Sequence, residues 1–71
     1  MNIDISTGDI VRLAGGGPVM KVLSLGVRSP ASGTMDGVLC RWAQKDLHYE
    51  WIYDRQALEL VTKERRRFAR S

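Results

Sequence analysis

The sequence predicts a small all-β domain, and three observations support this. Apolar residues recur with period two in short runs, and each run ends at glycine, proline or aspartate. Such alternation is typical of strands with one buried face, and such endings are typical of tight turns. The third observation is the length of 71 residues, which allows one domain. A domain of this size buries only about 60% of the surface that its unfolded chain exposes, so we expect marginal stability.

The expected strands cover residues 9–13, 19–25, 37–43, 47–53 and 58–62. Between the first two strands, three glycines at 15–17 precede Pro18, which predicts a turn rather than a phosphate-binding loop because the lysine and helix of such loops are missing. Residues 26–36 are small and polar, and they predict a mobile surface loop in which Ser32 is dispensable. Residues 54–57 are expected to form one helical turn.

Five short strands with a helical turn before the fifth predict an SH3-like barrel. We expect this barrel to cover residues 1–62, and a flexible basic tail to follow at 63–71.

The third and fourth expected strands concentrate the aromatic residues of the chain. One face of the third strand carries Val38, Cys40 and Trp42, and one face of the fourth carries Leu47, Tyr49, Trp51 and Tyr53. We expect Val38 and Trp42 to be core, and Tyr53 and Trp51 to add to it, while Tyr49 stays accessible. The remaining alternatives for this aromatic row are a dimer interface and a platform for stacked bases.

The positive charge of the chain is concentrated at its C-terminal end. Residues 1–61 carry six basic and seven acidic side chains, whereas residues 62–71 carry five basic side chains against Glu64 alone. Clustered cations of this kind attract nucleic acid, although a solubilising terminus is the simpler alternative. The candidate nucleic-acid-binding residues are Lys63, Arg65, Arg66, Arg67 and Arg70 in the tail, with Arg41, Lys45 and Tyr49 in the domain.

Enzymatic and metal-binding functions find little support. Cys40 and His48 are the only cysteine and histidine, so an internal disulfide and a zinc site are not expected. Cys40 falls on the predicted buried face, and His48 has no partner at a spacing typical of a catalytic relay. We expect no catalytic residue, no cofactor and no small-molecule substrate.

The N-terminal residues lack the basic and apolar segments of a signal peptide, and no apolar run is long enough to span a membrane. We therefore expect a cytoplasmic protein that does not bind membranes. Because small domains without disulfides or metals are often stabilised by oligomerisation, we also expect a homodimer.

Several motifs resemble those of the YodC-like family of small uncharacterised bacterial proteins. They are residues 8–13 (Gly-Asp-Ile-Val-Arg-Leu), residues 16–18 (Gly-Gly-Pro) with Met20 and Val22, the trio Val38, Cys40 and Trp42, and Tyr53 with residues 57–59 (Ala-Leu-Glu). The resemblance covers roughly residues 5–61. It implies the fold and leaves the function open, and the basic tail lies outside it.

Together these observations lead to two functional hypotheses. The first is a non-enzymatic protein that binds nucleic acid, DNA more than RNA, mainly through the backbone, and that regulates transcription or packages nucleic acid. The alternative is a protein-binding adaptor that uses the strand aromatics. Salt separates the two, because binding through phosphates weakens steeply as salt rises.

Overall fold

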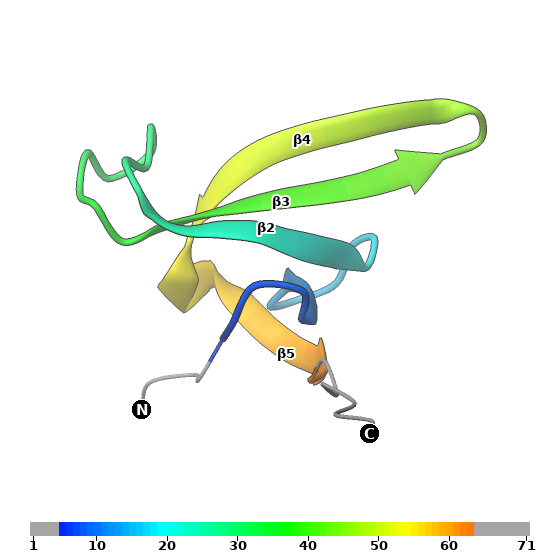
Figure 1. Cartoon of the computed structure of the whole chain (residues 1–71), viewed down its shortest axis with the longest axis horizontal. Helices are drawn as coiled ribbons and strands as arrows, with labels where there is room; N and C mark the ends of the chain where they lie inside the picture. The colour runs from blue at the N-terminus through cyan, green and yellow to red at the C-terminus, as the bar shows by residue number, and fades with distance from the viewer. Residues whose placement is uncertain (1–4, 64–71) are drawn as a thin grey trace, which may run out of the picture.

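The computed structural model describes residues 5–63, and it forms one sheet of five antiparallel strands (Figure 1). The elements are β1 (Ile10–Leu13), β2 (Met20–Val27), β3 (Gly37–Gln44), β4 (Leu47–Asp54), the 3-10 turn η1 (Arg55–Ala57) and β5 (Leu58–Thr62). The predicted all-β class and the helical turn before the last strand are confirmed.

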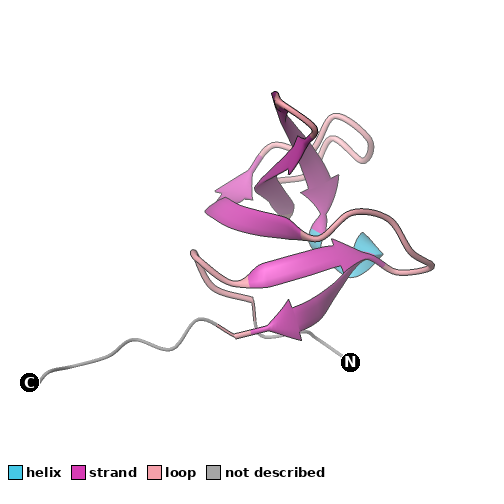
Figure 2. Ribbon diagram, turned by 90° about the vertical axis from the view of Figure 1, so that its right-hand side faces the viewer, coloured by secondary structure: helices cyan, strands magenta, loops and turns pink. Residues whose placement is uncertain are grey.

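The strands lie in the order β4-β3-β2-β1-β5, so β4 and β5 form the two edges. Figure 2 shows that the twisted strands do not lie in one flat layer. Within residues 5–63 no strand ladder joins β4 to β5, and the sheet is therefore open.

Strand β2 contains two irregularities in its pairing with β3. The register against β3 shifts between Val22 and Ser24 and again between Leu25 and Val27. Gly26, in the second shift, has a positive φ of 68°. A glycine in this conformation is typical of a β-bulge, which bends the strand and strengthens its twist.

The core lies on the face of the sheet that the alternation in β3 predicted. Its buried apolar side chains are Ile5, Val11, Met20, Val22, Val38, Cys40 and Leu58, and the partly buried Leu13, Leu25, Trp42 and Tyr53 pack against them. The expected burial of Val38 and Cys40 is confirmed, and Trp42 and Tyr53 contact the core from its margin.

The expectation that Trp51 adds to the core is wrong, because this side chain is 55% exposed. Trp51 lies directly opposite the buried Cys40. However, it belongs to β4, and within residues 5–63 no further strand lies beyond this edge of the sheet to extend the core.

The loop between β2 and β3 is held by an internal network of hydrogen bonds. The buried Ser29 donates its backbone N–H to the Thr34 carbonyl at 2.8 Å. Ser32 donates its hydroxyl to Asp54 Oδ1 of β4 at 2.9 Å. Ser32 therefore links the loop to the sheet, a role that the sequence did not predict.

The loop returns to the sheet at Gly37, where there is no room for a side chain. A Cβ atom at this position would lie 2.5 Å from the Val27 carbonyl oxygen and 2.7 Å from Ile52 Cγ2. Gly37 thus allows the Val27 backbone and the Ile52 side chain to lie close to the start of β3.

A buried carboxylate joins the N-terminal segment to the end of β5. Asp9 is fully buried, and its Oδ2 accepts hydrogen bonds from the Ser6 backbone N–H and from Lys63 Nζ, both at 2.8 Å. The Asp9 carbonyl accepts from the Val22 N–H at 2.9 Å, which ties the same residue to β2. Burying a charge costs several kcal/mol unless it is paired and hydrogen-bonded, so these contacts offset the cost of burying the Asp9 carboxylate.

We predict that Lys63→Ala lowers the free energy of unfolding by about 1–3 kcal/mol, because it removes a cation from a buried carboxylate. Arg12→Ala is the control, since it removes an exposed ion pair with Glu59 that contributes less than about 1 kcal/mol. Urea denaturation measures both. An equal effect of the two substitutions would contradict a structural role for Lys63.

We also predict that Gly37→Ala destabilises the domain by about 1–3 kcal/mol, because the added methyl group would overlap backbone and side-chain atoms. The melting temperature, followed by circular dichroism, tests this. An unchanged melting temperature would mean that β3 and the preceding loop can separate without cost.

Candidate nucleic-acid interface

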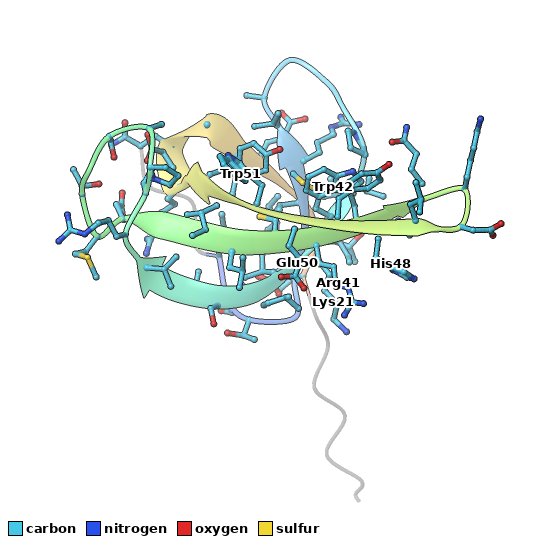
Figure 3. The ribbon with its side chains drawn as sticks, turned by 90° about the horizontal axis from the view of Figure 1, so that it is seen from above. Lys21, Arg41, Trp42, His48, Glu50 and Trp51 are labelled. Atoms are coloured by element: carbon cyan, nitrogen blue, oxygen red, sulfur yellow. The ribbon has the colours of Figure 1, made fainter. Side chains whose placement is uncertain are left out.

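The outer face of the sheet carries a cross-strand row of charged side chains. Lys21 of β2 lies opposite Arg41 of β3, and Arg41 lies opposite Glu50 of β4. All three are exposed. Figure 3 shows them with His48 on one side of the sheet, while Trp42 and Trp51 lie on the other side.

In the part of the chain that the structure describes, the two cations of this row take part in no ion pair. Within residues 5–63, ion pairs join Arg12 to Glu59, Arg55 to Asp36 and Lys63 to Asp9. Neither Lys21 nor Arg41 takes part in any of them. Like charges directly opposite each other destabilise a sheet, and Glu50, which lies opposite Arg41 on its other side, offsets part of this repulsion.

Lys21 was missed by the sequence reasoning. The signal was present, because Lys21 stands between Met20 and Val22, whose side chains are buried, and must therefore point outward. Its position opposite Arg41 depends on the strand order and on the register of β2, which the sequence does not reveal.

The inner face of the β3–β4 hairpin carries the aromatic residues. Trp42 stacks on Tyr49 with ring centroids 5.6 Å apart, and it also contacts Tyr53 at 6.3 Å. Leu47 and Trp51 on the same face are 60% and 55% exposed, and Tyr49 is 39% exposed. This surface is apolar and largely open to solvent.

The structure does not bring Tyr49 and Arg41 together, although the sequence reasoning grouped them. Tyr49 pairs with Trp42, which is the neighbour of Arg41 along β3. Neighbouring side chains in a strand point to opposite faces, so the phenol ring and the guanidinium lie on different sides of the sheet.

The other candidate residues lie at the hairpin tip and the C-terminal end. Lys45 is exposed in the two-residue turn between Gln44 and Leu47, with a positive φ of 58°. Lys63 Nζ contacts Asp9. The tail arginines Arg65, Arg66, Arg67 and Arg70 lie outside the described residues.

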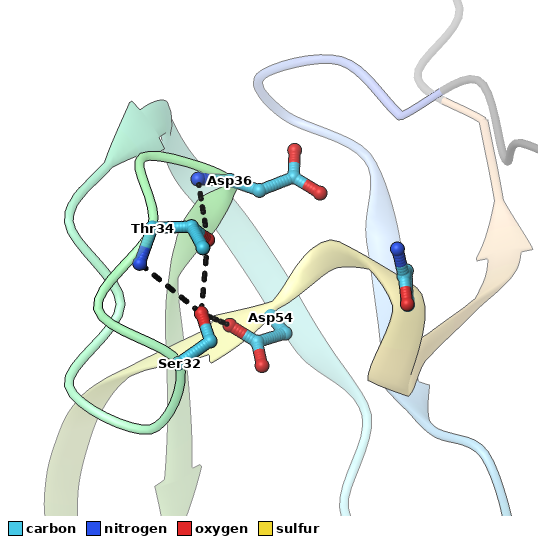
Figure 4. Close-up of a pocket in the computed structure, with 5 residues that line it drawn as sticks. Ser32, Thr34, Asp36 and Asp54 are labelled. Atoms are coloured by element: carbon cyan, nitrogen blue, oxygen red, sulfur yellow. Dashed lines mark hydrogen bonds between the residues drawn. The ribbon is translucent and has the colours of Figure 1, made fainter.

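A shallow pocket of about 120 Å³ lies where the β2–β3 loop meets the end of β4 (Figure 4). It is lined by Ser32, Thr34, Asp36, Asp54 and Gln56. The two hydroxyls are 2.9 Å apart, and Ser32 also donates to Asp54. Small-molecule sites usually enclose about 300–1,000 Å³, and the polar groups of this smaller pocket hold the loop in place.

Cys40 is buried, and its thiol lies 3.5 Å from the Val38 carbonyl oxygen. Burial raises the pKa of this thiol from 9.0 to about 11. The thiol is therefore neutral at physiological pH and is a poor nucleophile and metal ligand.

Residues 5–63 contain no group of three or more histidine, cysteine, aspartate or glutamate side chains that could hold a metal ion. They also contain no helix of the length and apolar character needed to cross a membrane.

These features define a small all-β protein with a charged face and an aromatic face. A family model described as an uncharacterized small protein, DUF2158, matches residues 6–58, and the chain belongs to this family. The matched region extends from the N-terminal segment to the first residue of β5 and includes both faces of the β3–β4 hairpin. No curated protein and no solved structure matches the chain.

We predict that Cys40 makes the stability of the protein fall at high pH. The pKa of the thiol is higher in the folded state than in the unfolded state. The contribution of the buried neutral thiol to the free energy of unfolding is therefore complete below pH 9, and it is lost as the pH rises from 9 through about 11. The loss approaches about 1.4 kcal/mol per pH unit where only the unfolded thiol ionises.

Urea denaturation between pH 8 and pH 11 measures this effect, and Cys40→Ala is the control because it lacks the thiol. The difference in unfolding free energy between the two proteins should change over that interval. A difference that is constant with pH would show that the Cys40 thiol ionises as easily in the folded chain as in the unfolded one.

Proposed function

We propose that this protein is a non-enzymatic nucleic-acid-binding domain that contacts the sugar–phosphate backbone, with a preference for DNA over RNA. The observation that carries the proposal is the juxtaposition of Lys21 and Arg41 on the outer face, where neither cation has an ion-pair partner within residues 5–63. A phosphate placed between them would offset their mutual repulsion.

The nature of the contact follows from the residues that make it. Lysine and arginine side chains on a sheet reach phosphate oxygens without entering a groove, and phosphate contacts carry no base information. Lys45 at the hairpin tip adds a third exposed cation. The arginines of the tail, Arg65, Arg66, Arg67 and Arg70, extend the positive charge along the chain.

The proposal includes an SH3-like arrangement of the strands. The order β4-β3-β2-β1-β5 and the 3-10 turn before β5 support it. The motif at residues 8–13 supports membership of the narrower YodC-like group. In this proposal the protein acts in the cytoplasm, in the regulation of transcription or in the packaging of nucleic acid.

Salt-dependent binding to duplex DNA tests the proposal. We expect the slope of log K against log salt to be about −0.9 for each phosphate contact. The double substitution Lys21→Ala with Arg41→Ala should make the slope shallower by about 2 and should weaken binding to all sequences alike. Fluorescence anisotropy with labelled duplexes at several salt concentrations measures both quantities.

Two further variants complete this experiment. Arg12→Ala is the matched control, because Arg12 is also a strand cation but is paired with Glu59. A truncation after Lys63 tests the tail arginines and keeps the contact of Lys63 with Asp9. Failure of the full chain to bind duplex or single-stranded DNA at low salt would refute the proposal. An unchanged slope in the double variant would show that Lys21 and Arg41 do not contact phosphates.

The second candidate function is a protein-binding adaptor. The observation in its favour is the exposure of Leu47 and Trp51 beside the stacked pair of Trp42 and Tyr49. Docking of a protein on this apolar surface would change little with salt, in contrast to binding of phosphates.

A further inference from the structure

The strand β4 has the features of an edge that pairs with another strand. It is eight residues long, and its ladder with β3 runs from Gln44 and Leu47 to Gly37 and Asp54 without a register shift. It contains no proline, lysine or glycine. Natural edge strands are usually short, bulged or rich in lysine, because a long regular edge invites pairing with another chain.

The opposite edge of the sheet is protected in that usual way. Strand β5 has five residues, and its pairing with β1 is interrupted by a register shift between Ile10 and Val11. The contrast shows that β4 is the edge suited to intermolecular pairing. Figure 1 shows β4 along the outer side of the sheet, with β3 on its inner side.

The register of the hairpin determines which backbone groups β4 offers. In an antiparallel ladder, hydrogen-bonded and non-hydrogen-bonded pairs alternate, and a two-residue turn is closed by a hydrogen-bonded pair. The backbone groups of Leu47, Tyr49, Trp51 and Tyr53 therefore point to β3. Those of His48, Glu50, Ile52 and Asp54 point away from the sheet and are available to a new strand.

We propose that β4 pairs antiparallel with β4 of a second copy of this chain, with the two-fold axis at Trp51. This pairing joins the two sheets into one and places each Trp51 opposite the Trp51 of the other copy. The inference goes beyond nucleic-acid binding, and it requires no ligand.

The charge pattern and the length of β4 favour this register over axes at Glu50 and at Tyr49. An axis at Glu50 would place the two Glu50 carboxylates opposite each other, which is unfavourable. An axis at Tyr49 would leave the end of β4 near Asp54 outside the strand pairing. The axis at Trp51 pairs almost the whole strand and places the His48 imidazole opposite the Asp54 carboxylate of the other copy.

The apolar surface of β4 also fits a second copy. Trp51 is 55% exposed in one chain, and it would be covered by its symmetry mate. Tyr49, which is 39% exposed, would lie opposite Tyr53 of the other copy, and aromatic pairs across strands stabilise a sheet. Self-pairing would therefore cover the exposed aromatic residues. Residues 5–63 bury seven apolar side chains within one chain, so this additional burial would stabilise a domain with a small core.

Sedimentation equilibrium of the full-length chain, without nucleic acid, tests the proposal. We expect a mass twice the 8.0 kDa of one chain at micromolar concentration. Glu50→Pro removes an outward-pointing N–H from each copy and leaves the ladder with β3 intact, so it should weaken the dimer about a hundredfold. Glu50→Ala is the matched control, because it removes the carboxylate but keeps the N–H, and it should remain dimeric.

Cysteine cross-linking tests the register, and it does so even if Glu50→Pro fails to fold. In a Cys40→Ala background, which removes the thiol opposite position 51, Trp51→Cys should form a disulfide-linked dimer with diamide as the oxidant. Opposed residues at a non-hydrogen-bonded pair have Cα atoms about 4.5 Å apart, within the range that a disulfide spans. Tyr49→Cys in the same background should not cross-link, because its partner is Tyr53.

A monomer throughout the micromolar range would overturn the proposal, and the β4 edge would then be open to a strand of a different protein. Cross-linking of Tyr49→Cys but not of Trp51→Cys would overturn the proposed register. Neither result bears on DNA binding, which is measured separately, so the two proposals fail independently.

Discussion

The two-residue turn at Lys45 and Asp46 fixes the relation between the two faces of this protein. It pairs Gln44 with Leu47, and the regular ladder then places every following residue of β4 opposite a defined residue of β3. Because side chains alternate along each strand, this one register sends Arg41 outward and Trp42 inward. A slip of one residue would exchange the two faces, so the separation of charged and aromatic side chains depends on this turn.

The buried Asp9 has the corresponding role at the other end of the sheet. Its carboxylate and carbonyl connect the segment before β1, the strand β2 and the residue after β5. Few apolar side chains are available to hold these segments together, since the buried core of residues 5–63 draws only Ile5 from before β1 and only Leu58 from β5. A polar contact between distant parts of the chain therefore replaces part of the apolar packing that a larger domain would have.

The sequence predicted the strands well because their signals are local. Alternation defined β3 and β4 almost to the residue, and glycine and proline marked the loops between strands. The exposure of Trp51, the juxtaposition of Lys21 with Arg41 and the contact of Lys63 with Asp9 could not be predicted. Each depends on strand order or on a bulge, and these are properties of the assembled sheet that no short stretch of sequence contains.

The separation of the two faces constrains how the proposed activities combine. A nucleic-acid strand lying on Lys21 and Arg41 cannot at the same time stack its bases on Tyr49, because the sheet lies between them. Pairing through the β4 edge covers neither Lys21 nor Arg41, and it repeats their positive charge on the same outer face of a continuous sheet. A dimer of this form would present two sets of phosphate contacts to one duplex, and its aromatic residues would contribute to assembly instead of base recognition.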